Sequence, residues 1–152
     1  MQLTPNFQDS ELGVEPGSGA TDQQINNAIY ICEKLLEPIR TQFGPIKVDD
    51  GYRNLAHNAA ADGVATSYHL FNGTESAADI KPLAPGATME QIFNWIRLFS
   101  HLPFDEVIYE TNVDGTPGCL HLQINSAATP RRIALTGETN NRAPYIHLAV
   151  NP

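Results

Sequence analysis

The sequence predicts a single α+β domain in which helices pack on a small antiparallel sheet. Two capped segments, 21–39 and 88–99, carry apolar residues at helical spacing, and short strand-like segments follow them. The chain has 152 residues, the size of one domain, with no internal repeat or linker. The first twenty residues are polar and rich in Gly and Pro. We therefore expect a loosely ordered N-terminal arm over 1–20 and one folded domain over 21–152.

The helices are predicted from their caps and their breakers. Thr21 can cap the first helix, and Pro38 is expected to kink it or to begin its last turn. Thr88 with Gln91 forms a capping-box signature for the second helix. Residues 54–65 are rich in Ala and Asn, and are consistent with either a short helix or an irregular loop.

The strands are predicted from alternation and turn residues. The turn-rich stretch TNVDGTPG suggests that 104–110 and 119–124 form an antiparallel hairpin. In LHLQI, His121 and Gln123 share the face opposite the apolar residues. The remaining candidate strands are 46–48, 77–80, 131–135 and 145–150.

Composition and hydropathy argue against several classes of function. The formal charge is -8 with only 9 Lys and Arg, which disfavours a nucleic-acid partner. No basic and apolar leader begins the chain, and no apolar run approaches the roughly 20 residues of a membrane span. We therefore expect synthesis in the cytoplasm without a signal peptide, and no membrane insertion. Cys32 and Cys119 lie far apart, which favours two free thiols over a disulfide.

Chemistry can be sought among five histidines and nearby carboxylates. His69, Asp79 and His121 would supply two imidazoles and one carboxylate, a set that leaves an open position on a tetrahedral zinc ion. Glu110 ends the strand that pairs with that of His121, where a carboxylate can act as a base. Spacing alone fits a surface histidine equally well at His121, and favours a solvated strand-end carboxylate at Glu110. His147 in PYIHLAV has the same strand-like context as His121.

A longer ordered set of motifs resembles a known family. The stretch GYRNLAHNAAADGVATSYHLFNGTESAADI is similar to the SGYR and S-x-H-x-x-G-x-A-x-D elements of the zinc DD-peptidases of the M15 type. These include D-alanyl-D-alanine carboxypeptidases and phage L-alanyl-D-glutamate endolysins, and share a fold with the hedgehog signalling domain. NFQDSEL, LLEPIRTQFGPIKV, PFDEVIYE, LHLQI and RRIAL resemble further elements of the phage-type branch. The likeness covers roughly residues 6–135.

The resemblance implies a role for each matching residue. His69, Asp79 and His121 match the zinc ligands. Glu110 falls where the phage-type and hedgehog-like branch carries its water-activating glutamate. His147 ranks below His121 as a ligand, because Glu110 and the following pair of arginines fit His121.

Two more matching positions concern the substrate, and some positions depart from the family pattern. Arg53 of the GYR element is implied to face the scissile carbonyl or a substrate carboxylate, and Ser67 to position the peptide. Asp50 replaces the usual serine before GYR, and Leu120 replaces a common tryptophan. The separation of ten residues between the first histidine and the aspartate implies an insertion, so we expect FNGTES to bulge outward. Cys119 shares the ligand face and is interpreted as packing.

The resemblance implies zinc-dependent hydrolysis of a peptide bond in bacterial peptidoglycan stem peptides. The enzyme would be a monomeric carboxypeptidase or endopeptidase of phage or prophage origin, which acts on the cell wall after release through a holin. Glu110 is the expected base, with Asp114 in the following turn as the alternative. The alternative function is a non-catalytic binding or structural protein of a phage particle that retains the fold.

Overall fold

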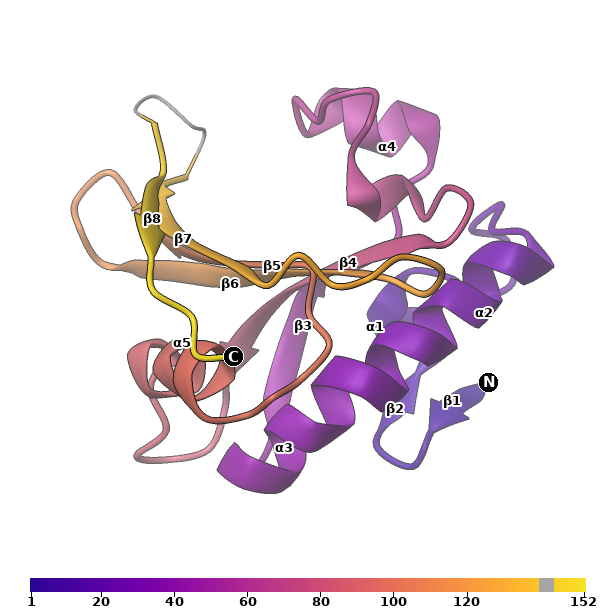
Figure 1. The fold of residues 1–152 in the computed structure, drawn as a ribbon. Helices are drawn as coiled ribbons and strands as arrows, with labels where there is room; N and C mark the ends of the chain where they lie inside the picture. Colours follow the sequence, from indigo (N-terminus) through magenta and orange to yellow (C-terminus); the bar gives the residue numbers. More distant parts are fainter. Residues whose placement is uncertain (140–143) are drawn as a thin grey trace.

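The main feature of the computed structural model, which describes residues 1–139 and 144–152, is a six-stranded sheet in the order β3-β4-β6-β5-β7-β8 (Figure 1). Its strands are β3 (Ile46–Asp50), β4 (Glu75–Pro82), β5 (Glu106–Thr111), β6 (Pro117–Asn125), β7 (Ile133–Glu138) and β8 (Ile146–Leu148). The predicted β5–β6 hairpin is antiparallel, as are all other neighbouring pairs except β5 and β7. The α+β class is confirmed, but the main sheet is mixed because β5 and β7 run parallel.

Three helical segments cover one face of this sheet. They are α2 (Asp22–Ile31), which continues through a π-helical turn (Cys32–Leu36) into α3 (Glu37–Phe43), and α5 (Met89–Leu98). Both predicted N-caps are confirmed, since the Thr21 and Thr88 hydroxyls accept from the backbone N–H groups of Gln24 and Gln91. The π-helical turn ends two residues before Pro38, whose missing N–H and bulky ring interrupt the regular hydrogen-bond ladder. None of the described helices is long and apolar enough to cross a bilayer.

The first twenty residues are folded rather than loosely ordered. They contain β1 (Gln2–Thr4) and β2 (Phe7–Gln8), which form a second, two-stranded sheet, and the helical turn α1 (Asp9–Leu12). Four of the apolar side chains in this segment, Leu3, Phe7, Leu12 and Val14, are buried in the core. The apolar burial offsets the entropy cost of ordering this Gly- and Pro-rich segment.

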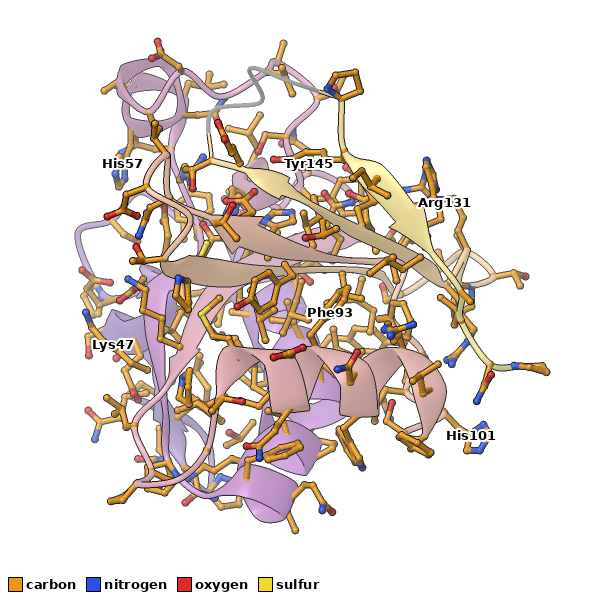
Figure 2. The ribbon with its side chains drawn as sticks, turned by 90° about the vertical axis from the view of Figure 1, so that its left-hand side faces the viewer. Lys47, His57, Phe93, His101, Arg131 and Tyr145 are labelled. Atoms are coloured by element: carbon orange, nitrogen blue, oxygen red, sulfur yellow. The ribbon has the colours of Figure 1, made fainter. Side chains whose placement is uncertain are left out.

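The core lies between the sheet and α2, α3 and α5. The alternation in β6 holds as predicted, because Leu120, Leu122 and Ile124 are buried on the helix side. Figure 2 shows Phe93 between α5 and the sheet, and Tyr145 on the other side of the sheet. That other face carries α4 (Leu55–Ala60) and a 3-10 turn (Tyr68–Leu70) at the β4 end, above the sheet in Figure 1. Polar residues of β4, β5 and β6 point to the same face.

Candidate metal centre

Three side chains on the face opposite the core bring their ligand atoms together. One nitrogen of His69, one carboxylate oxygen of Asp79 and one nitrogen of His121 all lie within 4.8 Å of one another. His69 Nε2 is 3.3 Å from His121 Nδ1 and 3.5 Å from Asp79 Oδ2, and His121 Nδ1 is 2.8 Å from Asp79 Oδ1. The structure thus groups the three residues that the resemblance implies as ligands.

His69 is held by its backbone and by its second ring nitrogen. It lies in the 3-10 turn, where Ser67 is the N-cap and its hydroxyl accepts from the His69 N–H at 3.3 Å. The His69 carbonyl accepts from Arg53 N at 2.7 Å. His69 Nδ1 donates to the carbonyl of Gly51 at 2.6 Å, which leaves a lone pair on Nε2.

Asp79 and His121 are placed by the sheet. They lie directly opposite each other in the antiparallel β4–β6 pair. His121 Nε2 donates to Gln123 Oε1 at 3.0 Å, which leaves the lone pair of Nδ1 facing Asp79. Gln123 follows His121 on the same face, as the strand period requires. The partners of the outer ring nitrogens therefore orient both imidazoles toward Asp79.

This donor set fits a divalent cation. Two imidazole lone pairs and one carboxylate converge, and the opposite nitrogen of each ring is hydrogen-bonded to an oxygen, as in metal sites with three protein ligands. A proton can take the place of the cation. Burial opposes the charge on His121, but the hydrogen bond and negative charge of Asp79 raise the pKa of His121 to about 9. Burial likewise opposes ionisation of Asp79, but the two histidines hold its pKa well below the usual range.

Arg53 lies beside the cluster and is already paired. Its Nε donates to Asp50 Oδ2 at 2.6 Å, and its Nη2 is 3.6 Å from Asp79 Oδ2. Asp50 is opposite Asp79 in the β3–β4 pair, next to an irregularity in the register. Arg53 is therefore positioned at the site by two carboxylates that come from neighbouring strands.

Glu110 lines the same cleft as the three candidate ligands. The Tyr145 hydroxyl donates to Glu110 Oε1 at 3.0 Å, and the Cys119 thiol approaches Glu110 Oε2 at 3.5 Å. The ring of Tyr145 packs against Gly137, where an added Cβ would lie 2.3 Å from Tyr145 Cδ1. Glycine at this position leaves the space that Tyr145 needs to reach Glu110.

The cleft has a volume of about 690 Å³ and is walled on one side by the loop that follows α4 and by the 3-10 turn. Its other walls come from β5, β6 and the β7–β8 region. It contains all six residues assigned to the site: Arg53, Ser67, His69, Asp79, Glu110 and His121.

The competing candidates lie elsewhere. His147 is exposed on β8 and takes no part in the cluster, although it pairs with Leu135 on the same sheet. His57 on α4 and His101 are exposed, as expected. Asp114 is in the exposed turn after β5, where its carboxylate accepts from the Thr116 N–H and hydroxyl.

The expectation that FNGTES bulges outward is wrong in part. Phe71 is fully buried, and only the following Asn72 and Gly73 are exposed. The Asn27 side-chain amide on α2 donates to the carbonyls of Phe71, Gly73 and Glu75, at 3.1, 3.0 and 3.2 Å. The segment between the first two candidate ligands is therefore tied to α2.

Sequence reasoning missed three residues that support the site. Gln123 was placed on the correct face, but its contact with His121 depends on rotamers that no pattern shows. Tyr145 reaches the cleft from a distant segment, and Asn27 on α2 holds the loop that joins His69 to Asp79. The sequence predicts the capped helix that contains Asn27, but it does not show which loop this side chain contacts.

The sequence model of the family described as Peptidase M15 matches residues 5–113. The chain belongs to the peptidase M15 family. Members of this family are metal-dependent peptidases, so the cluster of His69, Asp79 and His121 is interpreted as a metallopeptidase site. The match ends before His121, and the strand register rather than the match brings this residue to Asp79. No curated protein matches the chain.

Proposed function

We propose that the protein is a zinc peptidase that hydrolyses a peptide bond in bacterial peptidoglycan stem peptides. The observation that carries the proposal is the placement of Glu110 in the same cleft as the converging ligand atoms of His69, Asp79 and His121. A carboxylate that is not needed as a ligand, beside an open metal position, is the arrangement of a hydrolytic site.

Zinc is the proposed metal because two imidazoles and one carboxylate suit it and leave a coordination position open. When bound, zinc supplies a Lewis acid that polarises a carbonyl and makes a water molecule more acidic. The surrounding oxygen partners, Gly51 and Gln123, fix the histidine tautomers that this requires.

The residues of the chain supply the proton transfers and the positioning. Glu110 takes a proton from the attacking water as its oxygen bonds to the carbonyl carbon, and gives it to the leaving amine when the C–N bond breaks. Arg53 donates hydrogen bonds to the developing oxyanion. Ser67, at the cleft and directly before the turn of His69, positions the peptide. Tyr145 holds one oxygen of Glu110 and leaves the other turned toward Cys119.

The peptidoglycan substrate is supported by the family and by the motif resemblance. A phage or prophage origin, action on the cell wall after release, and a monomeric state rest on the resemblance to the phage-type branch. Sedimentation of the purified protein would check the monomeric state, and muropeptide digestion would check the substrate; the origin and the release stay predictions.

The decisive comparison is Glu110→Gln against Asp114→Asn, at equal zinc content measured by atomic spectroscopy. The amide of Glu110→Gln can hydrogen-bond a water but cannot take its proton, so hydrolysis should fall by about 10²–10⁴-fold with zinc retained. Asp114→Asn should retain near-normal turnover, since Asp114 lies in an exposed turn. The reverse pattern would assign the base to Asp114.

Metal removal tests the proposal as a whole. EDTA should abolish muropeptide hydrolysis, and added zinc should restore it. A purified protein that binds about one zinc per chain yet cleaves no muropeptide would instead favour a non-catalytic binding role.

A further inference from the structure

Arg53 is the one Lys or Arg among the described residues that line the cleft. Its guanidinium contacts Asp50 at 2.6 Å and lies 3.6 Å from Asp79. Only 14% of the Arg53 side chain and 23% of the Asp50 side chain are exposed, so solvent screens the pair weakly. Two carboxylates therefore surround one guanidinium before any substrate enters.

This arrangement is unfavourable for a substrate carboxylate. A strong pair with arginine needs a guanidinium whose charge and donors are free, ideally for two parallel hydrogen bonds. Asp50 occupies the Nε donor of Arg53 and balances its charge. Asp50 itself does not line the cleft, but a free carboxylate that reaches Arg53 there meets a guanidinium already balanced by Asp50, and the two carboxylates on one guanidinium repel each other.

The surface beyond Asp50 extends the same unfavourable potential. A second depression of about 590 Å³ is lined by Asp50 together with Glu11 and Glu15, and by Asp49, whose charge is balanced by Lys47 and Lys81. Lys47 also lines it, but its Nζ is paired with Asp49 at 2.6 Å. The whole chain carries a formal charge of -8, so no general attraction for anions compensates.

We propose that Asp50 is a specificity-determining residue that turns the cleft away from free carboxylates next to the scissile bond and toward internal peptide bonds. A neutral amide at the same place can accept a hydrogen bond from the remaining N–H groups of Arg53 without meeting the charge of Asp50. The inference rests on the proposed function and deepens it: the protein is an endopeptidase rather than a carboxypeptidase.

The test begins with the wild-type protein. Mass spectrometry of digested muropeptides should show an internal cut, with little release of a single terminal amino acid. Two peptides are then made that end one residue beyond the observed cut, one with a free carboxylate and one with a C-terminal amide. The wild-type protein should prefer the amide, with a kcat/KM at least about tenfold higher, since a hydrogen-bonded charge pair is typically worth that factor.

Asp50→Asn isolates the charge, because the asparagine oxygen can still accept from Arg53 Nε. We divide kcat/KM for the peptide with a free carboxylate by kcat/KM for the peptide with a C-terminal amide. Asp50→Asn should raise this ratio at least about tenfold. Asp49→Asn is the matched control, since it removes the same charge at the neighbouring position. The Asp49 carboxylate pairs with Lys47 and Lys81 rather than with Arg53. This control should leave the ratio within about twofold.

A binding measurement separates failure of this inference from failure of the proposed function. Calorimetry on zinc-loaded Glu110→Gln protein compares N-acetyl-D-alanyl-D-alanine with its C-terminal amide, with and without the additional Asp50→Asn change. Weaker binding of the acid, relieved by Asp50→Asn, supports the inference even if no muropeptide is cleaved. Equal binding of acid and amide, or an equal shift by Asp49→Asn and Asp50→Asn, overturns it.

Discussion

Replacing Asn27 by leucine should destabilise the protein through the loop that joins the first two candidate ligands. Asn27 is 3% exposed, and its side-chain amide nitrogen donates to three carbonyls, those of Phe71, Gly73 and Glu75. Leucine has a similar volume but no donor, so the carbonyls lose their partner without a large cavity.

The magnitude follows from the number of donors. The amide has two N–H groups for three carbonyls, so at most two full hydrogen bonds are lost, about 0.5–1.5 kcal/mol each. We expect the free energy of unfolding to fall by about 2 kcal/mol, a decrease in Tm of about 4–8 °C for a chain of this size. Urea denaturation in EDTA, followed by circular dichroism, measures this without a contribution from bound metal.

The control is Asn26→Leu, the same substitution on the same helix at an exposed position. Leucine is the better helix former, so this variant reports the small gain in helix propensity alone. The difference between the two variants is the contribution of the loop contacts. A difference below about 0.5 kcal/mol would refute the argument that Asn27 holds the loop, since that is the lower bound for a single hydrogen bond.

Three further predictions concern other contacts of the site and the sheet. Gln123→Leu removes the acceptor that orients the candidate ligand His121, and should weaken the affinity for zinc by about 10–100-fold in competition with a chelator. Gly137→Ala places a methyl group against the ring of Tyr145, and should lower turnover with zinc content unchanged; equal turnover would show that the ring can shift freely. Burial raises the pKa of Asp105, but hydrogen bonds from Arg131 outweigh burial and lower this pKa below its unfolded-state value of 3.8. The ion pair therefore contributes its full stabilisation at pH values above 3.8, and loses it as the pH falls through the folded-state pKa. The stability advantage of the wild type over Asp105→Asn, measured by urea denaturation, should therefore shrink as the pH falls from 5 toward 3.

The elements predicted from sequence were those with local signals. The caps at Thr21 and Thr88 depend on contacts within one turn, and the alternation from Leu120 to Ile124 repeats every second residue. The parallel pairing of β5 with β7 has no such signal, because it joins strands separated by an intervening hairpin strand. The order in the first twenty residues was missed because β1 and β2 are too short for a period to show.

The candidate ligands were found through an ordered set of motifs, and their supporting contacts were not. His69, Asp79 and His121 could be matched by position, whereas the hydrogen bond from Tyr145 to Glu110 spans 35 residues. Such contacts depend on side-chain packing across the fold, which one sequence does not show.

Two of the candidate ligands are therefore fixed by the sheet, and the third is fixed by loop contacts. Asp79 and His121 face each other in a strand pair whose neighbouring residues are buried in the core, so their separation follows from the register. His69 is placed by the carbonyl of Gly51 and by a turn whose following segment Asn27 ties down. Asn27→Leu should consequently weaken metal affinity by releasing His69, while amide hydrogen exchange in β4 and β6 stays slow. Faster exchange in those strands would mean that the loop and the sheet open together, and are not independent.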